Sequence, residues 1–167
     1  GGGWWDDGNA GTSFPTIRNC KFYRNYGYLG GALISRGTNS GISGPRIYNS
    51  IINGNTAFNG AGLYCLGFGG NNRTQLINSI ISGNSSEDGP AFYNTVNNGG
   101  TCIVSLTNCV VSGNRNSGTS DGAFYNDGSV GSCEVYLTNT IVWNNNAAFF
   151  NNDADVFVNY SMIQNPG

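Results

Sequence analysis

The stretch Leu76-Ile77-Asn78-Ser79-Ile80-Ile81-Ser82-Gly83-Asn84 decides the fold, because close copies of it recur along the chain. The other copies begin at Ile17, Ile47, Leu106 and Leu137, so successive starts lie 30, 29, 30 and 31 residues apart. A shorter sixth copy begins near Val158, 21 residues after the fifth. Five near-copies at an almost constant period indicate an architecture in which each unit stacks on the next.

The residues of the repeat favour strands and tight turns over helices. Each copy is rich in β-branched residues, asparagine and glycine, and none has the 3.6-residue spacing of an amphipathic helix. Short strands repeated along one axis form a β-solenoid with coils about 4.8 Å apart. We therefore predict an all-β, right-handed parallel β-helix of about five to six coils of about 30 residues. It forms one domain over residues 1–167, with coil boundaries near 17, 47, 76, 106, 137 and 158.

Aligned copies place similar residues in columns that we expect to stack as ladders. Two columns are apolar and indicate a core: Ile17, Ile47, Leu76, Leu106 and Leu137, and Phe22, Ile52, Ile81, Val111 and Val142. Two are asparagine ladders: Asn19, Asn49, Asn78, Asn108 and Asn139, and Asn25, Asn55, Asn84, Asn114 and Asn145. Stacked side-chain amides can hydrogen-bond along the solenoid and to the backbone of turns. We interpret both ladders as structural, with a polar binding track as the alternative.

Each coil carries a second strand after a variable loop, as in Gly60-Ala61-Gly62-Leu63-Tyr64. If the apolar residue before each aromatic points inward, alternation sends the next one outward. The outward column is then Trp5, Ile34, Tyr64, Tyr93 and Tyr125. An aromatic column on a rigid surface would suit sugar rings or another protein, so Trp5, Tyr64, Tyr93 and Tyr125 are our candidate ligand-binding residues. The alternative is that this column is buried or covered by loops or by another chain.

Two motifs of the first coil resemble a known family. Phe22-Tyr23-Arg24-Asn25 and Gly30-Gly31-Ala32-Leu33 resemble the FxxN and GGA(I/L/V) motifs of polymorphic outer-membrane protein repeats. The wider pattern, Asn-Ser-Ile-Ile-x-Gly-Asn followed by Gly-Ala-Phe-Tyr-Asn, is similar to secreted bacterial right-handed parallel β-helix repeat proteins. The resemblance covers nearly the whole chain. It implies the same fold and an extracellular or cell-surface location, and it implies no particular chemistry.

The five cysteines allow one disulfide on geometric grounds. Cys102 and Cys133 each lie four residues before their coil's leucine, so they stack on adjacent coils within reach of a disulfide. Cys20 and Cys109 share a column three coils apart, on the order of 14 Å, and cannot pair. We expect a Cys102–Cys133 bond or, alternatively, two small buried thiols. No CxxC motif and no histidine occurs, and we expect no metal and no cofactor.

Composition excludes several classes of partner. The net charge is −2 and Lys+Arg is 7, without a basic stripe of the kind that nucleic acids need. No apolar run approaches the length of a membrane span. The opening residues Gly1–Trp5 fit the second strand of a preceding coil, so we expect neighbouring coils in a longer protein.

Parallel β-helices also host polysaccharide lyases and hydrolases, so catalysis needs residues of its own. Asp6-Asp7 is our candidate pair of adjacent carboxylates for acid and base roles, and it lies in a glycine-flanked stretch typical of a turn. Arg18, Lys21 and Arg24 cluster on the first coil without a stacked acidic partner. We therefore predict a non-catalytic segment, a rigid stalk or an adhesive surface for a glycan or another surface protein. The alternative is a lyase or glycoside hydrolase whose catalytic coils lie partly outside this stretch.

Overall fold

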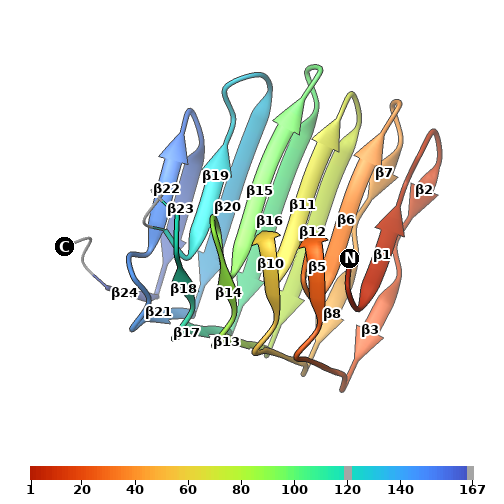
Figure 1. Ribbon diagram of the computed structural model, residues 1–167. Helices are drawn as coiled ribbons and strands as arrows, with labels where there is room; N and C mark the ends of the chain where they lie inside the picture. Colours follow the sequence, from red (N-terminus) through yellow and green to blue (C-terminus); the bar gives the residue numbers. More distant parts are fainter. Residues whose placement is uncertain (119–121, 165–167) are drawn as a thin grey trace.

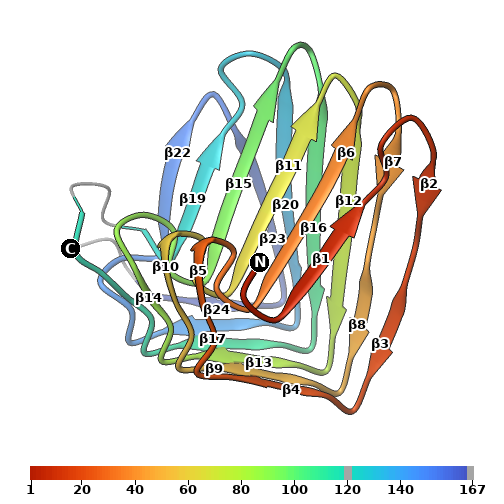
Figure 2. The same ribbon diagram turned by 45° about the vertical axis from the view of Figure 1, so that its right-hand side comes forward.

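The computed structural model describes residues 1–118 and 122–164, and its regular elements are all strands. They form a parallel β-helix of about 5 turns, as predicted from the repeat (Figure 1). The first four turns pass through the same four sheets in the same order, the described part of the later turns passes through three of them, and every neighbour in a sheet comes from the adjacent turn (Figure 2). Position along the solenoid axis therefore follows position in the sequence.

Four sheets run along the solenoid, and we name them A to D in the order in which a turn visits them. Sheet A contains β1 (Trp4–Asp7), β6 (Leu33–Thr38), β11 (Leu63–Phe68), β15 (Phe92–Asn97), β19 (Phe124–Asp127) and β22 (Phe149–Asn152). Sheet B contains β2 (Thr12–Ser13), β3 (Thr16–Arg18), β7 (Ile42–Ser43), β8 (Arg46–Tyr48), β12 (Asn71–Ile77), β16 (Thr101–Thr107), β20 (Ser132–Thr138) and β23 (Asp155–Asn159).

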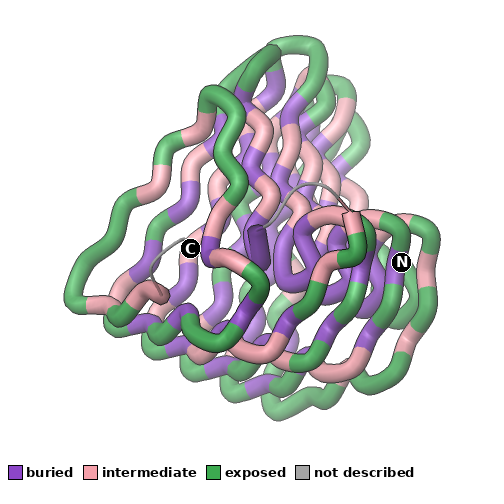
Figure 3. Tube along the Cα trace, turned by 60° about the vertical axis from the view of Figure 1, so that its left-hand side comes forward, coloured by how far each residue is buried: buried purple, intermediate pink, exposed green. Residues whose placement is uncertain are grey.

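The remaining two sheets are made of shorter strands. Sheet C contains β4 (Lys21–Tyr23), β9 (Ile51–Asn53), β13 (Ile80–Ser82), β17 (Val110–Ser112), β21 (Ile141–Trp143) and β24 (Met162–Ile163). Sheet D contains β5 (Tyr26–Leu29), β10 (Thr56–Asn59), β14 (Ser85–Ser86) and β18 (Arg115–Asn116). Sheet D forms a curl beside the lower end of sheet A, from which the chain turns back into sheet A (Figure 3).

The core consists of the apolar ladders that the repeat predicts. Register pairing joins Ile17, Ile47, Leu76, Leu106 and Leu137 in sheet B. It joins Phe22, Ile52, Ile81, Val111 and Val142 in sheet C. The inward column of sheet A adds Leu33, Leu63, Phe92 and Phe124, which are all fully buried. The rings of Phe92 and Phe124 stack with centroids 4.8 Å apart, so neighbouring turns pack closely through the interior.

The two predicted asparagine ladders differ in their physical role. Residues of the ladder that begins at Asn19 are exposed and have left-handed backbone, with φ from 49° to 55°. Asparagine is one of the few residues that adopt this conformation readily, so this ladder forms the corner between sheets B and C. We expected its amides to hydrogen-bond along the solenoid. Among the described residues, one such bond is present, from Asn108 Nδ2 to Asn78 Oδ1 at 3.1 Å.

The ladder that begins at Asn25 is hydrogen-bonded along its whole length, as predicted. The backbone N–H and Nδ2 of Asn55 both donate to Oδ1 of Asn84, at 3.0 Å and 2.9 Å. The same pair of bonds joins each asparagine to the next, and Gln164 accepts from the N–H of Asn145 at 2.8 Å. Because Asn55, Asn84 and Asn114 are completely buried, the bonds satisfy polar groups that water does not reach.

A polar column inside the corner between sheets A and B was not predicted. Asp6 and Asp7, expected in a turn, belong to strand β1. Asp6 points inward, is 4% exposed, and accepts hydrogen bonds from the hydroxyls of Ser13 and Ser43. Farther along the same column, Asn94 donates to Asn126 and Asn126 donates to Asn151, each at 2.7 Å.

None of the described segments is a helix long and apolar enough to span a membrane.

Candidate functional site

The outer face of sheet A carries the aromatic column that the alternation predicts. Register pairing joins Trp5, Ile34, Tyr64, Tyr93 and Tyr125, and continues to Phe150. From Tyr64 onward the rings are nearly parallel, with centroids 5.2, 4.4 and 4.9 Å apart and interplanar angles of 7°, 4° and 14°. In-register strands impose this stacking, because they hold equivalent Cα atoms close to the strand spacing.

Exposure varies along this aromatic column. Ile34 is buried at 4% exposure, and Tyr64, Tyr93 and Tyr125 are half-buried. The two ends are more open, with Trp5 53% exposed and Phe150 38% exposed. The column therefore offers the edges of a tyrosine stack in its middle and open ring surface at both ends.

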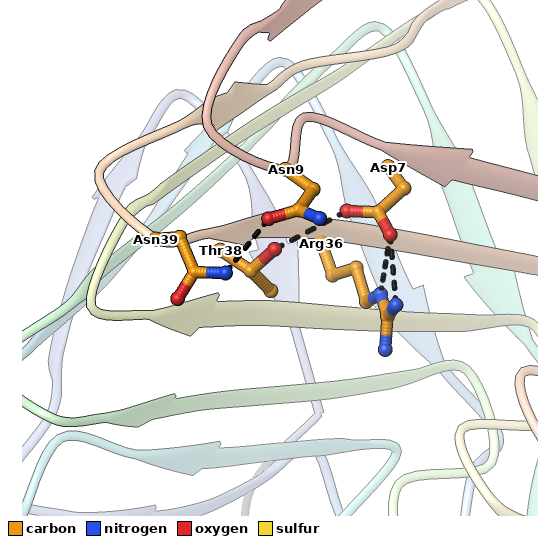
Figure 4. A network of polar contacts seen from close by, with 5 residues as sticks. All are labelled: Asp7, Asn9, Arg36, Thr38 and Asn39. Carbon is orange, nitrogen blue, oxygen red and sulfur yellow. Dashed lines mark hydrogen bonds and ion pairs between the residues drawn. The ribbon is translucent and has the colours of Figure 1, made fainter.

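A network of polar contacts lies at the N-terminal end of the column, and Figure 4 shows its members Asp7, Asn9, Arg36, Thr38 and Asn39. The guanidinium of Arg36 lies 4.7 Å from the centroid of the Trp5 ring and donates to Asp7 Oδ2 from Nε at 3.0 Å and from Nη2 at 2.7 Å. Thr38 donates to the other oxygen of Asp7 at 3.4 Å, and Asn39 donates to Asn9 at 2.8 Å. An exposed indole beside fixed donors and acceptors is an arrangement that recognises a ring with polar substituents.

The tyrosines of the column are held in their neutral form. Burial raises the pKa of Tyr93 well above its ordinary value, and the nearby Tyr125, Tyr64 and Asp88 raise it further. Burial also raises the pKa of Tyr64 and of Tyr125. The column therefore presents phenol groups rather than phenolates to a ligand at physiological pH.

Sheet D contributes aromatic residues that the sequence reasoning missed. Tyr26 and Tyr28 are 78% and 70% exposed, and the ring of Tyr28 stacks on Phe58 with centroids 5.3 Å apart. Tyr28 and Leu29 face Trp5 and Ile34 across a depression of about 290 Å³, so the curl extends the aromatic surface of sheet A. The signal was the two-residue alternation of Tyr26-Gly27-Tyr28 and Thr56-Ala57-Phe58, which lies in a stretch that we interpreted as a variable loop.

The predicted cysteine pair is in register. Cys102 of β16 and Cys133 of β20 are direct partners, and both are buried. All five cysteines are free thiols in the structure, so a bond between Cys102 and Cys133 stays a prediction. Burial is the main cause that raises the pKa of Cys102, and it raises that of Cys65 to about 12. Burial raises the pKa of Cys109 as well, so Cys65, Cys102 and Cys109 are poor nucleophiles, because the thiolate is the reactive form.

Metal-ligating side chains do not gather anywhere in residues 1–118 and 122–164: no three His, Cys, Asp or Glu residues come together there. Glu134 and Asp155 are register partners on the outer face of sheet B, and Tyr136 donates to Glu134 at 2.6 Å.

Compared with protein-family models, with curated proteins and with solved structures, the chain has no match.

Proposed function

We propose that this chain is a non-catalytic, adhesive segment of an extracellular or surface-anchored bacterial protein, and that the outer face of sheet A binds a glycan chain. The observation that carries the proposal is the aromatic column from Trp5 to Phe150, with its in-register stack of Tyr64, Tyr93 and Tyr125. The stacked tyrosines present ring edges and phenol hydroxyls on adjacent turns, and the open rings of Trp5 and Phe150 offer apolar faces to sugar rings at the two ends.

Rigidity supports this function. The first four turns bond to one another through four sheets and the later turns through three, and the asparagine ladder that begins at Asn25 adds side-chain bonds along the axis. A surface that is already ordered loses little conformational entropy when it binds a ligand. The same rigidity suits a stalk, which holds a binding surface away from a cell.

The motifs of the first coil support the cellular setting. Phe22–Asn25 and Gly30–Leu33 are the residues that resemble the polymorphic outer-membrane protein repeats. In the structure they form the end of sheet C and the turn into sheet A, which are two of the places where a turn changes direction. We include membership of a secreted bacterial β-helix repeat family in this proposal.

A glycan array tests the proposal with wild type and the variants Trp5→Ala, Tyr93→Ala and Tyr125→Ala. Each variant removes one ring of the column, and we expect affinity for the bound glycan to fall by about tenfold, or roughly 1.4 kcal/mol. The matched control is Trp143→Ala, because Trp143 is 52% exposed, like Trp5, but lies in β21 of sheet C. Equal binding by all five proteins would remove the aromatic column as the site, and depolymerisation of the glycan by wild type would contradict the non-catalytic role.

A further inference from the structure

The first coil carries three exposed cations that extend from the corner between sheets B and C to the far end of the sheet C strand. Arg18 ends β3, Lys21 begins β4, and Arg24 follows β4. The ion pair that the described residues form is Arg36–Asp7 on sheet A, so none of these three cations has an acidic partner within residues 1–118 and 122–164. We call Arg18, Lys21 and Arg24 the basic corner.

Aromatic rings hold all three cations in place. The guanidinium of Arg18 lies 4.0 Å from the centroid of Tyr48 on the next turn. Lys21 Nζ and the guanidinium of Arg24 lie 4.5 Å and 4.9 Å from the centroid of Tyr23. Cation–π contacts reduce the freedom of long side chains without neutralising their charge. The basic corner is therefore an ordered positive surface.

The backbone at Arg24 is the strongest indication that this surface has a use. Arg24 has φ 54°, in the left-handed region that is unfavourable for most residues with a side chain. The equivalent residues of the next four turns are Gly54, Gly83, Gly113 and Asn144, with φ 66°, 61°, 65° and 58°. Glycine is the residue that the turn itself favours, and a strained residue at one turn is a reason to look for a function there.

The neighbouring columns show that charge is specific to the first coil. Arg18 aligns with Tyr48, Ile77, Thr107 and Thr138, and Lys21 aligns with Ile51, Ile80, Val110 and Ile141. Beside the three cations, the second turn thus presents the ring of Tyr48 and the exposed side chain of Ile51. A ligand for this surface has anionic groups at one edge and an apolar face next to them.

Charge along the axis limits where an anionic ligand can bind. Six of the seven basic residues lie between residues 18 and 73, and seven of the nine acidic residues lie between residues 87 and 155. Because sequence order is axial order, the first turns are positive and the later turns are negative. A long, densely charged polyanion would be repelled by most of the rod, whereas a chain that crosses the first turn is attracted.

We infer that the basic corner binds an acidic polysaccharide, with carboxylate or sulfate groups on Arg18, Lys21 and Arg24 and a sugar face against the exposed side chain of Ile51. This site lies on a different face from the aromatic column of sheet A and does not depend on the function proposed for that column. Carboxylate and sulfate share the negative oxygens that guanidinium and ammonium groups bind by charge-assisted hydrogen bonds.

Binding of the protein to immobilised alginate, heparin and neutral dextran tests the inference, since alginate supplies carboxylates and heparin supplies sulfates in addition. We expect retention on at least one acidic polysaccharide, none on dextran, and weakening as salt rises. Arg24→Gly is the decisive variant. It removes one cation and restores the residue that the backbone favours, so affinity should fall about fivefold while the thermal midpoint stays equal or rises. A triple variant that combines Arg24→Gly with Arg18→Gln and Lys21→Gln should no longer be retained on alginate or heparin.

The matched control is Arg73→Gln, which removes an exposed cation of β12 outside the basic corner. Its affinity should change less than twofold. An equal loss in Arg73→Gln and Arg24→Gly would overturn the inference, because it would show that net charge alone determines retention. Tighter binding to a single-stranded oligonucleotide than to either acidic polysaccharide would overturn it as well. Trp5→Ala distinguishes the two sites, because it affects the column of sheet A and should leave retention on alginate and heparin unchanged.

Discussion

Asn84 donates twice to one atom of Asn114: its backbone N–H lies 3.1 Å and its Nδ2 lies 2.9 Å from Asn114 Oδ1. Asn114 repeats the arrangement toward Asn145, and its Nδ2 also reaches the carbonyl of Ile81 at 3.0 Å. The side chain of Asn114 thus links its own turn to the turns before and after it. Asn84 and Asn114 have no exposed surface, so water does not reach these bonds.

Replacing Asn114 with alanine should strongly destabilise the fold. The change leaves the backbone N–H of Asn84 and one of its two Nδ2 hydrogens buried without an acceptor, at about 1–3 kcal/mol for each, and it removes a donor to the carbonyl of Ile81. We expect a loss of at least about 3 kcal/mol in the free energy of unfolding, measured by urea denaturation. The control is Asn108→Gly in the exposed ladder, where φ is 55° and glycine fits the backbone; this change should cost less than about 1 kcal/mol. Similar losses in both variants would contradict the distinction between the two ladders.

The turn from sheet D into sheet A should not tolerate a side chain. Gly60 has φ 65°, and a Cβ built there would lie 2.6 Å from the carbonyl oxygen of Leu63. Gly60→Ala should therefore lower the thermal midpoint more than Gly99→Ala. Gly99 has a similar φ of 68° but no atom within 4 Å of such a Cβ, so its variant measures the backbone cost alone. Equal midpoints for the two variants would show that the curl relaxes around the added methyl group.

Stability should fall at alkaline pH because buried thiols and phenols favour their protonated forms. Burial raises the pKa of Cys65 from 9.0 to about 12, so the folded state keeps the proton that the unfolded chain releases. The resulting stabilisation is complete below pH 9 and is lost as the pH rises toward about 12. Urea denaturation across this range should give a smaller alkaline decline for Cys65→Ala than for wild type. The remaining decline belongs partly to Tyr64, Tyr93 and Tyr125, whose pKa values are also raised. A slope that Cys65→Ala leaves unchanged would contradict this account.

Oxidation should join Cys102 to Cys133 before any other pair. The two residues are register partners on adjacent strands, so their Cα atoms lie at about the strand spacing of 4.8 Å, within the range of disulfides. Mild oxidation followed by proteolysis and mass spectrometry should yield this one cross-link. In the native protein, exposed Cys20 should be the thiol that reacts with iodoacetamide. Five reactive thiols in the unfolded, oxidised protein would exclude the bond.

The repeat predicted those features that depend on the identity of one residue in each turn. A two-residue alternation decides which side chain of a strand points inward, so the apolar ladders and the outward position of Trp5, Tyr64, Tyr93 and Tyr125 followed from aligned copies. The pattern did not predict how deeply Ile34 and the tyrosines are buried, because that depends on how the curl of sheet D approaches the outer face of sheet A.

Two further features depended on contacts between different sheets. Asp6 looked like a turn residue because glycines flank it, yet its carboxylate lies inside, hydrogen-bonded to Ser13 and Ser43 of sheet B. The aromatic surface of sheet D lay within a stretch of variable length, where Tyr26, Tyr28 and Phe58 belong to strands too short to show a pattern alone. The corner ladder beginning at Asn19 was recognised as structural, but its left-handed backbone, and not amide stacking, explains the asparagine.

The bonding of each turn only to its two neighbours has a mechanical consequence. Inter-strand hydrogen bonds run along the solenoid axis, so tension applied between the two ends loads every interface between turns in series, and the interfaces break one at a time. A turn that detaches releases about 30 residues, which extend to roughly 100 Å of slack. Under load, the rod would lengthen in steps of that size while the remaining turns stay folded, so it would act as a shock absorber as well as a spacer.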